Sequence, residues 1–130
     1  MTKRTGPCPP VILVVDDEAL LRMLAIEHFE EAGYEVIEAE DGASALMALE
    51  ARPDIQALFT DVQMPGRPDG FALARTVRKT SPGCAIVVVS GRAAPHDDDL
   101  AEGVRFVTKP YWGSEIVSLI SGMIGHSARP

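Results

Sequence analysis

The chain has 130 residues, of which 46% are hydrophobic and 24% charged, a composition typical of one folded globular domain. Its formal net charge is −7, the wrong sign for a protein that neutralises phosphates, so we expect no direct nucleic-acid partner. The longest apolar run, residues 84–89, is far shorter than the roughly 20 residues that span a bilayer, and the N-terminus lacks the apolar stretch of a secretory signal. These features predict a cytoplasmic protein without a membrane partner.

Five short apolar segments alternate with segments of helical spacing, in which apolar residues recur at i, i+3 and i+4. The predicted strands cover residues 11–15, 34–39, 56–60, 84–90 and 104–108. The predicted helices cover residues 21–32, 43–51, 71–79 and 114–124, and the apolar face of the first comprises Leu21, Leu24, Ala25, Phe29 and Ala32. Such alternation produces a parallel sheet through right-handed crossovers. We therefore expect an α/β domain over residues 11–124, with a doubly wound five-stranded parallel sheet, between flexible tails at 1–10 and 125–130.

Polar side chains follow four of the five predicted strands. Asp16 and Asp17 come after the first strand and Asp61 after the third, Ser90 ends the fourth, and Lys109 comes after the fifth. Because the carboxyl ends of parallel strands meet at one edge of a sheet, these side chains are expected to converge. Crowded carboxylates repel one another, and a hard dication with oxygen ligands relieves that repulsion. The pattern therefore predicts a Mg²⁺ site at this edge.

Four short sequences carry a family resemblance. They are Val-Val-Asp-Asp-Glu at 14–18, Thr-Asp-Val-Gln-Met-Pro-Gly at 60–66 with Asp-Gly at 69–70, Val-Val-Ser-Gly at 88–91, and Phe-Val-Thr-Lys-Pro at 106–110. Together they resemble the receiver domain of two-component response regulators, over about residues 11–124. The chain is similar to the single-domain chemotaxis and sporulation regulators, or to a receiver cut from a longer protein. The resemblance implies a flavodoxin-like sheet with strand order 2-1-3-4-5.

The resemblance also implies how the acidic residues act. Asp61 would accept a phosphoryl group from a sensor histidine kinase or a histidine phosphotransfer protein. Asp17 and Asp61 would bind Mg²⁺ with the main-chain carbonyl of Gln63, and Asp16 would contribute partly through water. This role suits an aspartate, because a carboxylate attacks phosphorus without a general base and the transition state mainly needs its oxygens neutralised.

Further residues would bind the phosphoryl group and report its presence. By the same resemblance, Ser90 and Lys109 would hold the phosphoryl oxygens, and Phe106 would be the aromatic switch residue. Gln63 and Arg92 stand two residues beyond Asp61 and Ser90, where family members control the lifetime of the aspartyl phosphate. Arg92 is long and cationic, so it is expected to shield the phosphoryl group from water and slow self-hydrolysis.

Two segments depart from the family pattern. The loop at 64–70 is one residue longer than usual, which reshapes the rim of the site. Residues 92–99 contain Pro95 and three adjacent acids, so the fourth helix of the family is expected to be short or irregular here. The downstream protein partner is therefore expected on the fifth strand and the last helix. Tyr111 and Trp112 follow the fifth strand and fit a core or an interface equally well. His28, on the first predicted helix, fits a packed or boundary position.

Three alternative functions are weighed against this prediction. A haloacid-dehalogenase-like phosphatase also uses an aspartate nucleophile and Mg²⁺, but it needs a second aspartate two residues later, where Gln63 stands. A flavodoxin-like electron carrier needs a Ser/Thr/Gly-rich loop after the first strand, whereas this loop is acidic. A pseudo-receiver that takes no phosphate disagrees with the complete set of acids and lysine. We expect a signalling module that catalyses at most its own phosphorylation and dephosphorylation.

Overall fold

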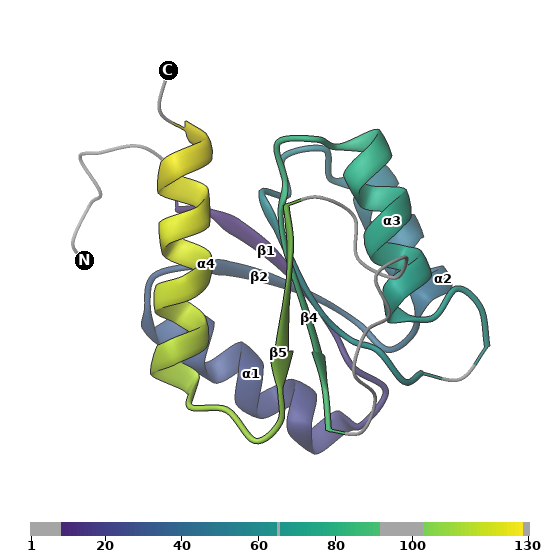
Figure 1. Cartoon of the computed structure of the whole chain (residues 1–130), viewed down its shortest axis with the longest axis horizontal. Coiled ribbons are helices and arrows are strands. Elements are labelled where there is room, and N and C mark those ends of the chain that lie inside the picture. The colour runs from purple at the N-terminus through teal and green to yellow at the C-terminus, as the bar shows by residue number, and fades with distance from the viewer. Residues whose placement is uncertain (1–8, 65, 92–102, 129–130) are drawn as a thin grey trace.

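A five-stranded parallel sheet lies between two layers of helices in the computed structural model, which describes residues 9–64, 66–91 and 103–128 (Figure 1). The strands are β1 Val11–Val15, β2 Glu35–Ala39, β3 Ala57–Asp61, β4 Ala85–Ser90 and β5 Val104–Thr108. The helices of the described residues are α1 Ala19–Glu31, α2 Gly42–Ala51, α3 Gly70–Thr80 and α4 Gly113–Ala128. The strand order β2-β1-β3-β4-β5 confirms the predicted doubly wound, flavodoxin-like fold.

The sheet buries a hydrophobic core on each face. Successive side chains of a strand point to opposite faces, so Ile12 packs with α1 and α4, whereas Leu13 packs with α2 and α3. All five residues of β1 are buried, as the continuous apolar run predicted. Phe29 of α1 and Ile120 of α4 fill the first core, and Leu73 of α3 fills the second. Both helix layers are therefore fixed to the sheet whose edge carries the site.

Side-chain caps start two of the helices near the carboxyl edge of the sheet. The Asp41 carboxylate accepts a hydrogen bond of 2.8 Å from the Ser44 amide and caps α2. Asp69 caps α3 in the same way, through a bond of 2.9 Å from the Ala72 amide. Such caps stabilise a helix start by about 1 kcal/mol. Asp69 thereby anchors the end of the loop that leaves β3 at Asp61.

The predicted apolar face of α1 is wrong at three positions. Ala25 and Phe29 are buried, but Leu21 is 36% exposed and Leu24 is 47% exposed, and Ala32 lies exposed at the helix end. Ile26 is partly buried against the same core as Ala25 and Phe29. The helix is nearly as apolar on its outer side as on its inner side, so apolar spacing alone does not show which face is buried. The two leucines instead face the segment that follows β5.

Both ends of the predicted domain differ from the structure. The Pro10 carbonyl accepts a bond of 2.9 Å from the Glu35 amide, so Pro10 already lies on the sheet, while residues 1–8 lie outside the described residues. Helix α4 continues to Ala128, beyond the predicted end at Ile124, because Gly125 weakens a helix without breaking it. The predicted short fourth helix falls in residues 92–102, outside the described residues. None of the described helices is both long and apolar enough to cross a membrane.

Candidate functional site

The carboxyl edge of the sheet brings two acids and a lysine together. Asp16 directly follows β1, Asp61 is the last residue of β3, and Lys109 directly follows β5. The Lys109 Nζ atom lies 3.4 Å from Asp61 Oδ2 and 4.0 Å from Asp16 Oδ2. Asp16 and Asp61 are each only 8% exposed, so these charges interact with little screening by water. The parallel sheet thus assembles residues that are far apart in the sequence.

Asp17 completes a group of three carboxylates. Within the described part of the chain, Asp16, Asp17 and Asp61 each offer one carboxylate oxygen, and these atoms all lie within 4.8 Å of one another. Asp17 is exposed, so the group is open to solvent on one side. Hard oxygen donors with an open side suit Mg²⁺, which keeps several waters and accepts phosphate oxygens. The donor set therefore fits a divalent cation.

The pKa of Asp16 is raised above its ordinary value of 3.8. Burial of the carboxyl is the largest cause, and the neighbouring charges of Asp61 and Asp17 add to it. A hydrogen bond of 2.9 Å from the Glu18 amide and the charge of Lys109 act in the opposite direction but do not cancel the rise. Negative charge at Asp16 is therefore unfavourable in the protein without a bound cation.

Substitution Asp16→Asn is expected to stabilise the metal-free protein at neutral pH. A carboxyl whose pKa is higher in the folded chain than in the unfolded chain favours folding when protonated, so its effect on stability worsens as the pH rises above about 3.8. Asparagine keeps an oxygen for the Glu18 amide and removes the charge. At pH 7 in a chelator we expect a melting temperature about 3 °C above the parent, equivalent to about 1 kcal/mol.

Thermal unfolding followed by circular dichroism checks this prediction. The matched control is Asp54→Asn, because Asp54 pairs with Arg52 at 2.8 Å and its pKa is lowered, so its loss should not stabilise the fold. Added Mg²⁺ should raise the melting temperature of the parent more than that of Asp16→Asn. An Asp16→Asn protein that melts at or below the parent temperature in the chelator contradicts the prediction.

Ser90 and Phe106 connect the acidic group to β5. Ser90 is the last residue of β4, is fully buried, and its carbonyl accepts a bond of 2.9 Å from the Lys109 amide. Phe106 pairs with Val88 in the strand register and stacks on Phe71 of α3 with ring centroids 6.2 Å apart. The end of β4 is therefore linked to β5 both at Lys109 and at Phe106.

Of the two residues predicted to control phosphoryl lifetime, only Gln63 lies in the part of the chain that the structure describes. Gln63 lies exposed in the loop after β3, two residues from Asp61, and the structure gives no contact from its side chain to the acidic group. Arg92 lies outside the described residues. The roles of Gln63 and Arg92 stay predictions from the family resemblance.

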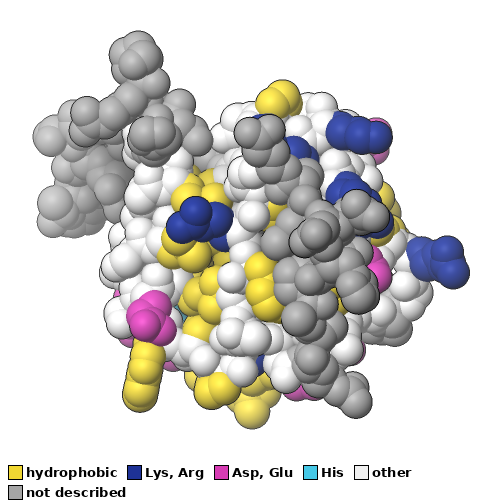
Figure 2. Space-filling view, viewed as in Figure 1, with side chains coloured by type: hydrophobic (Ala, Val, Ile, Leu, Met, Phe, Trp, Pro, Cys, Tyr) yellow, Lys and Arg dark blue, Asp and Glu magenta, His cyan; other side chains and the backbone are white. Residues whose placement is uncertain are grey.

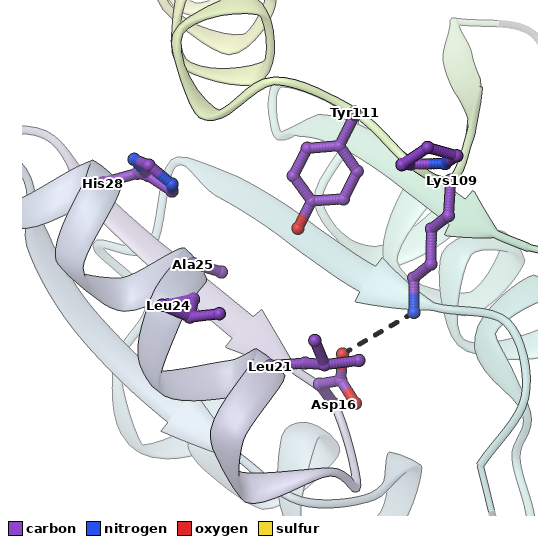
Figure 3. Close-up of a pocket in the computed structure, with 8 residues that line it drawn as sticks. Asp16, Leu21, Leu24, Ala25, His28, Lys109 and Tyr111 are labelled. Carbon is purple, nitrogen blue, oxygen red and sulfur yellow. Dashed lines mark ion pairs between the residues drawn. The ribbon is translucent and has the colours of Figure 1, made fainter.

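A pocket of about 460 Å³ opens beside Asp16, between α1 and the segment after β5 (Figure 3). The Tyr111 ring points into it and packs edge-to-face on Phe59 at 5.6 Å, whereas Trp112 is 75% exposed. Tyr111 is thus partly buried and packs against the core, whereas Trp112 lies on the surface. His28 lines the pocket beside Gly113 but is exposed, so the predicted packed or boundary position is not confirmed.

Tyr111 remains a neutral hydroxyl at physiological pH. Burial, together with the nearby charges of Asp16 and Asp61, raises the pKa of Tyr111 to about 12. A phenolate would add a further negative charge to a site that already carries three carboxylates. The pocket wall next to the acids is therefore uncharged at this position.

The sequence patterns do not single out Arg22, which contacts the acidic loop. Arg22 Nη1 donates a hydrogen bond of 2.7 Å to the main-chain oxygen of Asp16. The available signal was a cation one helical turn after an acidic loop, but such a residue is usually a solvated charge. Only the folded chain shows that the guanidinium points back toward the strand end.

Comparisons with known proteins agree on the family. The model of the response regulator receiver domain matches residues 12–121. The response regulator receiver protein CpdR of Brucella abortus is 32% identical over 116 residues, which cover 87% of this chain and 95% of CpdR. A crystal structure of a response regulator receiver protein from Sinorhizobium medicae superposes with a TM-score of 0.86 at 28% identity, covering 92% of this chain and 97% of that one.

A receiver joined to a kinase is also similar. The receiver domain of the hybrid histidine kinase CckA has a TM-score of 0.75 at 31% identity and covers 88% of this chain and 98% of that one. The chain spans only 43% to 53% of several transcriptional regulators that it matches.

The fold and the acidic edge define a signalling domain of two-component systems. The chain belongs to the response regulator receiver domain family. Receiver domains are signalling modules, not conventional enzymes. Membership of this family argues against the phosphatase and the flavodoxin-like electron carrier, which belong to other families.

Proposed function

We propose that this receiver is a phosphoacceptor, modified on Asp61 in the presence of Mg²⁺, and that the modification changes its binding to other proteins. One observation carries the proposal. The Asp61 carboxylate lies 3.4 Å from the Lys109 amine, and its oxygen lies within 4.8 Å of a carboxylate oxygen of Asp16 and of Asp17. The three acids and the lysine that phosphorylation requires are therefore together. Two buried carboxylates beside a third are unfavourable without a cation, and their presence with Lys109 argues against a pseudo-receiver.

The chemistry at Asp61 is a phosphoryl transfer. A carboxylate oxygen of Asp61 attacks the phosphorus of a phosphohistidine on the donor, so an O–P bond forms and the P–N bond breaks. The bonding electron pair stays on the imidazole nitrogen, and the aspartyl phosphate is the product. Lys109 and Ser90 then bind phosphoryl oxygens at the strand ends. Gln63 and Arg92 are assigned control of the phosphoryl lifetime.

The cation site is assigned to the same edge. Asp16, Asp17 and Asp61, with the main-chain carbonyl of Gln63, would hold Mg²⁺. A bound Mg²⁺ supplies positive charge that neutralises the phosphoryl oxygens in the transition state. This exchange is assigned to the cytoplasm, where the kinases that use ATP operate.

The donor protein is placed over α1. Helix α1 begins two residues after Asp17, and its side chains Leu20, Met23 and Leu24 are 69%, 62% and 47% exposed. Figure 2 shows hydrophobic side chains at the lower surface, where α1 lies in the same view. A donor histidine must reach Asp61, so its protein has to cover surface next to the acidic edge. Exposed apolar side chains at that place favour a sensor histidine kinase or a histidine phosphotransfer protein as the partner.

The output surface is placed on β5 and α4. A phosphoryl group on Asp61 offers Ser90 and Lys109 contacts that the free carboxylate lacks, and this difference shifts the equilibrium between two states. Phe106 lies beside β4 in the strand register, where a movement of Ser90 changes the space available to its ring. A downstream protein partner that contacts β5 and α4 would detect this change.

Intact-mass measurement tests the proposal. The parent, incubated with acetyl phosphate and Mg²⁺, should gain one phosphoryl group, and Asp61→Asn should gain none, because its amide cannot attack phosphorus. The matched control is Asp54→Asn, since Asp54 is an exposed acid outside the acidic group. A chelator should abolish the uptake in the parent. Equal uptake by Asp61→Asn and the parent would show that the site is wrong.

A further inference from the structure

Arg22 is a half-buried cation that contacts the main chain of the acidic loop. Its side chain is 16% exposed and makes two hydrogen bonds in different directions. Nη1 donates to the main-chain oxygen of Asp16 at 2.7 Å, and Nε donates to Glu38 Oε1 at 2.8 Å. Glu38 lies on β2 and Arg22 on α1, so one guanidinium links helix α1, strand β2 and the loop that joins β1 to α1.

The bonded carbonyl lies at a sensitive point of the chain. The pairing of β1 with β2 ends at Val15 and Ala39, and the last main-chain bond here is the 3.2 Å contact from the Asp16 amide to the Ala39 oxygen. The Asp16 oxygen belongs to the peptide that joins Asp16 to Asp17. Arg22 therefore fixes the orientation of the peptide group between two of the three carboxylates.

We infer that Arg22, oriented by Glu38, is a positioning residue that sets the affinity of the acidic group for a divalent cation. The inference rests on the proposed function only in taking that cation as Mg²⁺. Groups that hydrogen-bond metal ligands and orient them commonly change metal affinity 10- to 100-fold when they are lost. Arg22 is such an orienting group, because it hydrogen-bonds the main chain of Asp16 and leaves the carboxylates free to bind the cation.

Two effects of Arg22 on cation affinity oppose each other. Its positive charge repels a cation, while its hydrogen bond holds the carboxylates in place. The ion pair with Glu38 at 2.8 Å offsets most of the charge seen from the site, so the positional effect should dominate. Lysine separates the two effects, because it keeps the charge but cannot make two bonds in the fixed fork geometry of a guanidinium.

The experiment is a calorimetric titration of the full chain with MgCl₂. In Arg22→Lys the dissociation constant for Mg²⁺ is expected to rise about 10-fold, at the lower end of the range for lost orienting partners. Glu38→Gln keeps Arg22 but removes the ion pair that orients it, so the dissociation constant for Mg²⁺ should rise here too. The matched control is Arg52→Lys, because Arg52 pairs with Glu35 of β2 and with Asp54 at 3.1 and 2.8 Å, near the opposite end of β2 from Glu38.

A kinetic readout separates positioning from general damage. With acetyl phosphate as donor, Arg22→Lys should need more Mg²⁺ for half-maximal phosphorylation yet reach the parent rate at saturating Mg²⁺. Melting temperatures establish that the variants are folded. If Arg22→Lys does not fold, Glu38→Gln still tests the inference.

Each outcome decides for or against the inference. A dissociation constant for Arg22→Lys within about twofold of the parent overturns it, since that is far below the effect of a lost orienting partner. An equal loss in Arg52→Lys, or a parent that binds no Mg²⁺, also overturns it. Weaker Mg²⁺ binding in Arg22→Lys without phosphate uptake by any variant supports the inference and refutes the proposed phosphorylation. Phosphate uptake on Asp61 with unchanged Mg²⁺ affinity in Arg22→Lys supports the proposed phosphorylation and refutes the inference.

Discussion

Replacing Gly70 by alanine is expected to lower the free energy of unfolding by about 3 kcal/mol, the upper range for overpacking a closed site. Gly70 is the first residue of α3 and packs directly on the end of β3. A Cβ atom built there would overlap the main-chain oxygen of Asp61 and lie 2.6 Å from the Cα atom of Val62. Both are main-chain atoms, so neither can rotate away as the end of a side chain could.

The same substitution is expected to impair phosphorylation in the fraction that folds. The Gly70 amide donates a bond of 2.9 Å to the Val62 oxygen, so α3 cannot withdraw without breaking this contact. Relief of the overlap therefore has to displace the main chain of Asp61 and so disturb the position of its carboxylate beside Lys109.

Urea unfolding checks the stability effect, with two glycines as matched controls. An added Cβ at Gly122, inside α4, or at Gly83, in the turn before β4, meets nothing within 4 Å. Gly122→Ala should stabilise the protein by about 0.8 kcal/mol, because alanine is the better helix former, and Gly83→Ala should be nearly neutral. A Gly70→Ala protein as stable as the parent would show that α3 can shift freely against β3.

Substitutions Leu20→Glu and Met23→Glu are expected to slow phosphotransfer from a histidine kinase about 10-fold each, the effect of about 1.4 kcal/mol in binding. Both side chains are more than 60% exposed, at 69% and 62%, so a charge costs little in the free receiver. In a complex that covers α1, the same carboxylate loses water and gains no partner. Phosphorylation by acetyl phosphate, which needs no docking surface, should be unchanged.

The control for surface charge is Met47→Glu. Met47 lies on α2 in the opposite helix layer and is 70% exposed, so it matches Met23 in type and exposure. Phosphotransfer profiling of the parent against candidate histidine kinases identifies the fastest donor. The transfer rates of the variants are then compared with that donor. If Leu20→Glu and Met23→Glu transfer as fast as Met47→Glu, the donor does not cover α1.

The fold was predictable because its signals are local. The run at residues 11–15 is apolar at every position, which suits a strand covered on both faces, and β1 is buried throughout. Alternation of such strands with helices restricts the topology to parallel crossovers. The order of strands came from the family resemblance, and the structure confirms it. Helix and strand ends differ by one or two residues in most elements, because capping contacts such as that of Asp69 lie outside the periodic pattern.

The acidic edge was predictable for a related reason. Asp16 and Lys109 directly follow strands and Asp61 ends one, and a parallel sheet places all its carboxyl ends at one edge. Their convergence therefore depends on the fold class and not on the details of packing. The contacts of Lys109 with both acids follow from that arrangement.

Only the tertiary structure decided which side chains face one another across elements. Helical spacing shows that α1 is apolar, but not that Leu24 stays exposed beside a pocket, and adjacent aromatics at Tyr111 and Trp112 give no sign of which one packs on Phe59. The bond from Arg22 to the Asp16 oxygen likewise depends on how α1 returns over β1. A sequence pattern determines the direction of a side chain within its own helix or strand, whereas its neighbours depend on how helices and strands distant in the chain are packed together.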